Sequence, residues 1–141
     1  MKVPDPADIR QYLSELRDYN KARRRRAVMK LGLAGGDEAV TALIMALQNR
    51  NEDLIVRGRA ALMLGRLGDG RAVTALINAL DAPGMQTPLH AARSLGRLGD
   101  DRAIEPLLLI AGSAEGKLRA AALEALARLG CPAVAPADAE D

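Results

Sequence analysis

The sequence predicts an all-α protein, a right-handed α-α superhelix of about eight helices. A leucine-glycine pair occurs at Leu31-Gly32, returns 33 residues later at Leu64-Gly65 and another 31 residues later at Leu95-Gly96. A period of this length, built from helix-length apolar segments, is typical of a solenoid in which each unit is buried only against its neighbours. Hydrophobic residues make up 49% of the chain, yet only two residues are Tyr and none is Phe or Trp. The core is therefore expected to be aliphatic and alanine-rich, which favours helices over strands.

Residues 1–20 are expected to form a capping helix. The segment Pro4-Asp5-Pro6 marks its start, and Ile9, Leu13 and Leu16 recur at helical spacing on one face. This segment does not match the repeat. An atypical first helix is what the apolar end of a solenoid needs to be shielded from water.

Residues 21–130 are expected to hold about three and a half repeat units, each full unit consisting of two helices. The expected helices cover residues 21–34 and 37–48, then 53–67 and 70–80, then 87–98 and 101–111, and finally 115–129. Pro132 and Pro136 interrupt any continuation, so the acidic segment 131–141 is expected to be a disordered tail.

The turn inside each unit carries glycine and aspartate. Gly68 and Gly99 fall where a helix end favours a left-handed residue, and the following Asp69 and Asp100 are expected to cap the next helix. In the first unit the aspartate, Asp37, comes one place later, so its cap is expected to shift by one. Gly65 and Gly96 lie inside helices, where close approach of a neighbouring helix is the expected reason for glycine.

An arginine recurs seven residues before the leucine-glycine register, at Arg24, Arg57 and Arg119. It is expected to bond a turn aspartate such as Asp69. Pro88 replaces it in the third unit, which leaves two interpretations open. Either stacking and curvature change there, or Thr87 caps the helix and Pro88 is its first residue.

The pattern R-x-x-A-x-x-x-L-G-x-L-G-D-x-R-A-V-x-x-L-x-x-A-L, read from Arg57 to Leu80, resembles the HEAT repeat. It is most similar to the short HEAT-like repeats named after phycobilisome lyases, and the resemblance covers about residues 21–130. The resemblance implies an interaction scaffold, because repeats of this kind bind proteins in many unrelated settings. It also permits a bilin lyase or a phycobilisome-assembly subunit, although known lyases of this type are usually longer or work as pairs.

No catalytic arrangement stands out, so a non-enzymatic role without a metal or cofactor is expected. His90 is the single histidine, and no serine is marked as a nucleophile. HEAT-repeat iron hydroxylases resemble this chain in fold, but they require several His-Glu pairs and this sequence has none. The glycines follow the turns and form no phosphate-binding loop. A single cysteine, Cys131, excludes an intramolecular disulfide and a cysteine-based metal site.

The second helices are expected to offer a binding surface on the concave side of the solenoid. Periodicity turns one set of equivalent positions away from the core: Thr41, Met45, Thr74, Asn78, Glu105 and Leu109. Met45 and Leu109 are apolar at positions expected to face water, so they are the preferred contacts for a protein partner.

A basic edge is the alternative surface. Five arginines carry it: Arg23, Arg25, Arg66, Arg97 and Arg128. Such an edge suits an acidic protein or nucleic-acid phosphates. The alternative without a binding function is that these arginines belong to a solvated, salt-bridged helix face. Nucleic acid is the minor alternative, because the net charge is only +2 and aromatic rings for base stacking are nearly absent.

The last expected helix carries an apolar stripe. Leu118, Ala122, Leu126 and Leu129 form a stripe that would face a missing second helix, so they are a candidate surface for self-association; alternatively the helix packs back and leaves a modest exposed edge.

The sequence has no 18-residue apolar run and no signal-peptide pattern, so a cytoplasmic protein without membrane contact is expected.

Overall fold

The computed structural model describes residues 5–131. In this range the chain forms eight α-helices and two short 3-10 turns and contains no β-strand, which confirms the predicted all-α, right-handed α-α superhelix. The elements are α1 (Pro6–Glu15), α2 (Lys21–Ala34), α3 (Asp37–Gln48), α4 (Leu54–Leu67), η1 (Gly70–Ala72), α5 (Val73–Ala79), α6 (Gln86–Leu98), η2 (Asp101–Ala103), α7 (Ile104–Ser113) and α8 (Gly116–Arg128).

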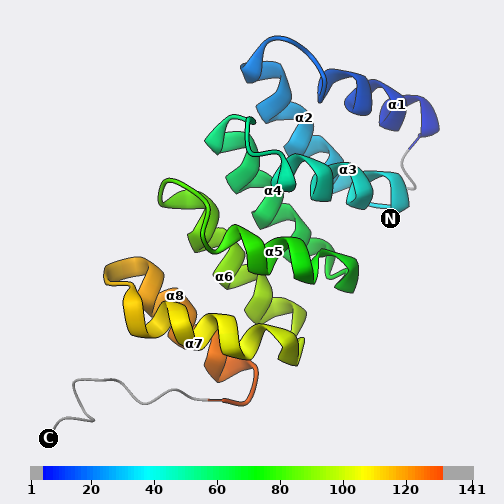
Figure 1. The fold of residues 1–141 in the computed structure, drawn as a ribbon. Helices are drawn as coiled ribbons and strands as arrows, with labels where there is room; N and C mark the ends of the chain where they lie inside the picture. The colour runs from blue at the N-terminus through cyan, green and yellow to red at the C-terminus, as the bar shows by residue number, and fades with distance from the viewer. Residues whose placement is uncertain (1–4, 132–141) are drawn as a thin grey trace, which may run out of the picture.

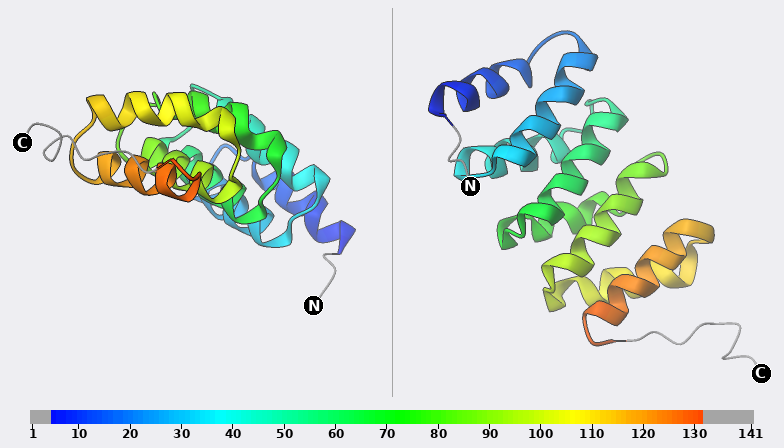
Figure 2. Two further views of the ribbon diagram at one scale, coloured as in Figure 1. Left: turned by 90° about the horizontal axis from the view of Figure 1, so that it is seen from below. Right: turned by 180° about the vertical axis from the view of Figure 1, so that it is seen from behind.

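The helices lie in two layers (Figure 1). α2, α4, α6 and α8 pack in succession in one layer, and α3, α5 and α7 follow one another in the other. α3, α5 and α7 each pack on the first helix of the following unit, and Figure 2 shows α7 covering α8 in the view from below. α1 packs mainly on α2 and less extensively on α3. The described chain therefore exposes α3, α5 and α7 as one row, which we call the second-helix row.

The core runs through the whole array without interruption. Each helix from α2 to α8 contributes a leucine that has no exposed surface: Leu31, Leu43, Leu64, Leu76, Leu95, Leu107 and Leu126. Buried alanines fill the space between them. Because the same register position is buried in every unit, the repeat period directly encodes the core.

The turns inside the second and third units match their prediction. Gly68 and Gly99 end α4 and α6 in the left-handed conformation, with φ of 71° and 70°. The side chains of Asp69 and Asp100 each accept a hydrogen bond from the backbone N–H two residues further on. The helix that follows opens with a 3-10 turn, η1 or η2, a detail that periodicity does not predict.

The expected cap in the first unit is wrong. Gly36, with φ of 93°, precedes α3, Asp37 is already the first helical residue, and no side chain caps this end. The Asp37 carboxylate instead accepts a hydrogen bond from Arg71 of the next unit, at 3.1 Å. Two successive glycines, Gly35 and Gly36, make the turn by backbone freedom alone.

The start of α6 also differs from the prediction. The helix begins at Gln86, so Thr87 is not its cap and Pro88 is not its first residue. Thr87 is buried, and its hydroxyl donates to the carbonyl of Leu54 at 3.4 Å. Pro88 is tolerated within the first turn, where a backbone N–H has no intrahelical partner. A change of curvature at this position stays a prediction.

Glycines inside the helices bring neighbouring units together, as expected. A Cβ added at Gly65 would lie 2.8 Å from the Cα of Ser94, and one added at Gly96 would lie 2.9 Å from the Cα of Ala125. The Ser94 hydroxyl donates to the carbonyl of Ala61 at 2.6 Å. α4, α6 and α8 thus approach one another too closely for any larger residue at these two positions.

Two of the three periodic arginines bond the preceding unit rather than a turn aspartate, whereas Arg24 pairs with Glu52, which follows α3. Arg57 Nε donates to the carbonyl of Leu47 at 3.0 Å, and Arg119 Nε donates to the carbonyl of Ala111 at 3.1 Å. The expected bond to Asp69 is wrong, because Asp69 accepts from Arg71. The last carbonyls of a helix lack intrahelical donors, and an arginine from the next unit satisfies them.

The predicted terminal segments are described only in part. α1 falls within the proposed cap, and Ile9 is its one buried residue. Of the predicted tail 131–141, only Cys131 lies within the described residues. The division into cap, repeats and tail stays a prediction.

Candidate functional site: the exposed row of second helices

The six predicted partner-binding residues are all exposed on the second-helix row. They are Thr41 and Met45 on α3, Thr74 and Asn78 on α5, and Glu105 and Leu109 on α7. We call this set the second-helix strip. Met45 and Leu109 are 65% and 71% exposed, although both are large and apolar. The strip therefore has an apolar residue at each end and a polar centre at Asn78.

The α7 end of the strip is more apolar than periodicity alone predicts. Leu108 is 38% exposed beside Leu109, and Pro106 and Ile110 are half-buried. Apolar side chains in water favour burial by about 25 cal/mol for each Å² removed from solvent. This end of the row is thus suited to hydrophobic contact.

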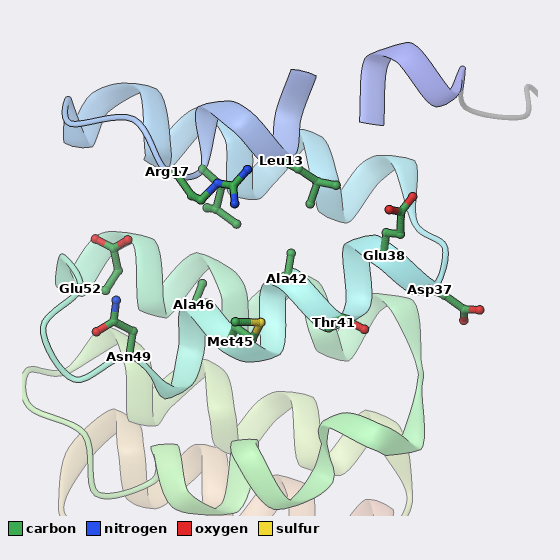
Figure 3. A pocket seen from close by; sticks show the side chains of 11 residues that line it. Leu13, Arg17, Asp37, Glu38, Thr41, Ala42, Met45, Ala46, Asn49 and Glu52 are labelled. Carbon is green, nitrogen blue, oxygen red and sulfur yellow. The ribbon is translucent and has the colours of Figure 1, made fainter. Parts of the chain in front are cut away.

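The α3 end of the strip opens into a groove beside α1 (Figure 3). This groove has a volume of about 690 Å³. Its apolar part is formed by Leu13 and Leu16 from the first helical segment and by Ala42, Met45 and Ala46 from α3. We call it the α1–α3 groove. Sequence reasoning missed it, because the strip was predicted from the repeats alone and the groove depends on how α1 sits beside them.

Polar side chains surround the α1–α3 groove. Asp37, Glu38 and Thr41 lie toward one end and Asn49 and Glu52 toward the other, as Figure 3 shows. A further polar lining residue, Arg17, lies between the two helices. The groove is thus apolar along its length and charged at its ends.

Ion pairs lie near the starts of two second helices, and one of these pairs joins two units. Arg71 Nη2 lies 2.8 Å from Asp69 and 3.1 Å from Asp37 of the preceding unit. Arg102 makes the corresponding 2.8 Å pair with Asp100. The hydrogen bond from Arg102 lowers the pKa of Asp100 to about 2, and Arg71 lowers the pKa of Asp69 in the same way. These carboxylates therefore stay charged at neutral pH and keep their ion pairs at the starts of the second helices.

The five arginines of the predicted basic edge do not lie together. Arg66, Arg97 and Arg128 are exposed in the last turns of α4, α6 and α8. Arg23 and Arg25 lie near the start of α2, and Figure 1 shows the starts of the first helices at the opposite side of their layer from their ends. The single edge of five arginines is therefore wrong, because successive first helices run parallel and the two groups occupy opposite helix ends.

The arginines of α2 are also engaged in structural pairs. Arg25 makes a two-bond pair with Asp53, at 2.8 and 2.9 Å, and Arg23 lies 3.2 Å from Asp18. The Arg25 hydrogen bonds lower the pKa of Asp53 to about 2, and Asp53 in turn caps α4 by accepting from the N–H of Val56. For Arg23 and Arg25 the salt-bridged reading is the correct one.

The C-terminal stripe is not an uncovered face. Ala122 and Leu126 have no exposed surface, and Leu118 and Leu129 are half-buried against the core. The expectation that these four residues form a free self-association surface is wrong, because α8 turns this face onto α6 and α7. The helix packs back, as the alternative interpretation had it.

The single histidine and the possible metal ligands can be placed within the described residues. His90 is half-buried on α6, and burial, followed by the nearby Arg93, lowers its pKa. Its Nδ1 is buried and has no hydrogen-bond partner in the described structure. Within residues 5–131, His, Cys, Asp and Glu side chains nowhere gather in threes in a way that would hold a metal ion. None of the helices in that range is long and apolar enough to cross a bilayer.

Two layers of paired, stacked helices with a repeating core define an α-solenoid built from helical repeats. The chain belongs to the HEAT repeat family. A family model described as HEAT repeats matches residues 9–86, more than half of the chain, and a model of the PBS lyase HEAT-like repeat matches residues 89–110 and 118–137. Both matches agree with the predicted resemblance. A search of curated protein sequences returned no match.

Solved structures with similar folds include two natural proteins. One is from the complex of CpcE and CpcF of phycocyanin lyase from Nostoc sp. PCC7120, with a TM-score of 0.76 and 28% identity over 92% of this chain and 56% of that one. The other is human deoxyhypusine hydroxylase in complex with glycerol, with a TM-score of 0.75 and 25% identity over 90% of this chain and 45% of that one. An engineered protein, with a TM-score of 0.64 and 19% identity over 86% of this chain and 62% of that one, shows the fold alone. This chain spans about half the length of the two natural proteins.

Proposed function

We propose that this chain is a non-catalytic scaffold that binds another protein through the second-helix strip. One observation carries the proposal: Met45 and Leu109 hold the same register position in different units and expose 65% and 71% of their surface. Both side chains lie outside the buried core, so packing within this chain does not account for their apolar character. Large exposed apolar residues rimmed by polar ones are typical of protein-binding surfaces.

The chemistry of the strip supports a protein rather than a small-molecule partner. Asn78 and Glu105 offer hydrogen-bonding groups between the two apolar ends, and the row spans three units. An interface with buried apolar anchors and a polar surround has the usual anatomy of a specific protein complex. Methionine adapts its shape to varied partners, which suits Met45 to such a role.

The test is a Met45→Glu, Leu109→Glu double variant compared with the wild type in capture of partners from the native source. Both side chains are exposed, so the thermal melt should change little, since surface substitutions usually shift stability by no more than about 0.5 kcal/mol. The captured protein should be lost, because two carboxylates would have to be desolvated in the interface.

An Arg66→Glu, Arg97→Glu double variant is the matched control, because both arginines are exposed in the other layer. It should retain the partner. Retention by the strip variant together with loss from the arginine variant would contradict the proposal and assign binding to the basic residues of α4 and α6.

A second candidate is a bilin lyase or phycobilisome-assembly subunit. Its support is the likeness to the CpcE and CpcF complex of phycocyanin lyase, at 28% identity over 92% of this chain. Co-expression with a bilin source separates the two functions. A coloured complex with bilin absorbance would favour the lyase class, and a colourless complex with one stoichiometric protein would favour the scaffold.

A further inference from the structure

We propose that the α1–α3 groove binds one amphipathic helix of a partner protein, and that this helix lies antiparallel to α3. The inference rests on the proposed function and names the part of the scaffold that a partner enters. It is carried by three observations on the groove: an apolar floor in which Ala42 is less covered than its counterpart in the next unit, two charges without ion-pair partners among the described residues, and a length of about three helical turns.

One residue of the groove floor, Ala42, is covered less completely than its counterpart elsewhere in the array. Ala42 and Ala46 of α3 correspond in register to Ala75 and Ala79 of α5. In α5 these positions are 3% and 1% exposed, because α3 packs beside them. In α3 the neighbour is α1, which leaves Ala42 half-exposed, whereas Ala46 is buried at 8% exposure. Met45, on the same side of the groove, is 65% exposed. The first helix of the row thus has room beside it for an additional element.

The facing wall is apolar as well. Leu13 and Leu16 are half-buried and contact the core on one side while they line the groove on the other. Small alanines on one wall and leucines on the other leave a channel that accepts the side chains of a helix at spacings of three, four and seven residues. No strand edge exists in the described structure, so an extended peptide would find no backbone ladder to join.

Two charges at the groove have no ion-pair partner among residues 5–131. Glu52 is already bound by Arg24 at 3.0 Å, and Asp37 by Arg71 at 3.1 Å. Arg17 and Glu38 are exposed and make no ion pair within the described part of the chain. Figure 3 places Glu38 near one end and Arg17 toward the other. A complementary occupant carries a carboxylate opposite Arg17 and a cation opposite Glu38.

This arrangement of charges fixes the direction of the occupant. Helices favour acidic residues in their first turn and basic residues in their last turn, because of the helix dipole. Glu38 lies in the first turn of α3, so a helix whose last turn meets Glu38 runs antiparallel to α3. The α3 wall is 12 residues long, which at 1.5 Å per residue corresponds to about 18 Å, or about three turns of the occupant.

Two synthetic helical peptides of one composition test the inference. Both have leucines on one face at helical spacing, but the first has glutamates in its first turn and lysines in its last turn, and the second has the reverse. Fluorescence anisotropy with the whole chain should show the first peptide binding more tightly, by about threefold or more, since an exposed ion pair contributes up to about 1 kcal/mol. Equal binding of the two peptides, or no binding of either, would overturn the inference.

A charge-swapped chain, Arg17→Glu with Glu38→Lys, provides the decisive arm. It should reverse the preference and bind the second peptide more tightly. Arg97→Glu with Glu124→Lys is the matched control, because both residues are exposed on helices remote from the groove, and it should leave the preference unchanged. Met45→Glu should weaken both peptides. Thermal melts of each variant establish that the fold is intact.

Other results distinguish the proposed groove from the proposed scaffold function. Concentration-dependent dimers that Met45→Glu abolishes would make a second copy of this chain the occupant and would overturn the inference. Loss of the native partner by Leu109→Glu but not by Met45→Glu or Arg17→Glu would also overturn it, while leaving the proposed function intact. Charge-dependent peptide binding by a chain that loses its native partner through Met45→Glu but keeps it through Leu109→Glu would support the groove and contradict a contact at the α7 end of the strip.

Discussion

Asp53 shows how a single side chain joins two repeat units. It caps α4 through the N–H of Val56 at 3.2 Å and holds Arg25 of α2 at 2.8 and 2.9 Å. The Arg25 hydrogen bonds, the main cause, lower its pKa from 3.8 to about 2. A carboxyl whose pKa is lower in the folded state stabilises the fold above its unfolded pKa, and this contribution is lost as pH falls through the folded value. The relevant pH window is therefore from about 4 down to about 2.

We expect Asp53→Asn to lower the free energy of unfolding at neutral pH by about 1 kcal/mol, because it keeps the capping oxygen and loses the charge. Asp53→Ala should cost about 1–2 kcal/mol, because it loses both. Urea unfolding followed by circular dichroism measures these differences. The gap between wild type and Asp53→Asn should narrow as pH falls from about 4 to about 2, and a constant gap across that range would rule out the ion pair as its source.

At the scale of the helices, α4, α6 and α8 stack through glycines rather than through large side chains. Gly65 lies directly against Ser94, and an added Cβ would meet the Ser94 side chain as well as its Cα. Alanine has the higher helix propensity by about 1 kcal/mol, so glycine is retained here for the close approach it permits. The absence of a Cβ at Gly65 thus allows α4 and α6 to approach this closely.

Gly65→Ala should therefore lower the free energy of unfolding by about 1–3 kcal/mol, because the helices must separate to admit the methyl group. Gly112→Ala is the control: Gly112 lies in α7 with no atom within 4 Å of an added Cβ, so it should be neutral or stabilising by up to about 1 kcal/mol. Equal effects of the two substitutions in urea unfolding would mean that the close approach does not constrain this position.

The helix boundaries that sequence predicts best are those with local punctuation. α2 and α3 match their predicted bounds because Asn20, Gly35 and Gly36 mark the ends. The start of α6 was predicted less well, since the α-helix extends back through Gln86 without a side-chain cap. The bonds of Arg57 and Arg119 to carbonyls of the preceding unit were also not predictable, because nothing in the local sequence distinguishes a carbonyl acceptor from an aspartate.

At the scale of the whole molecule, the repeat period predicts which side chains face water but not how neighbouring elements tilt. All six strip residues are exposed as predicted. The α1–α3 groove was missed because α1 lies outside the repeat, so no register relates Leu13 to Ala42. For the C-terminal stripe the sequence left two alternatives open, because the repeat lacks a second helix there, and the structure shows α8 packing this stripe onto α6 and α7. End effects depend on tertiary packing, which a one-dimensional period does not contain.

Site-specific photo-cross-linking in the native source tests the proposed binding surface most directly. A photoreactive amino acid replaces Asn78, at the exposed centre of the second-helix strip, and in a parallel experiment replaces Arg97, which is exposed in the other layer. The proposal predicts that one protein becomes covalently attached from position 78 and not from position 97. Attachment from position 97 alone would contradict the proposal and move the binding surface to the layer of first helices.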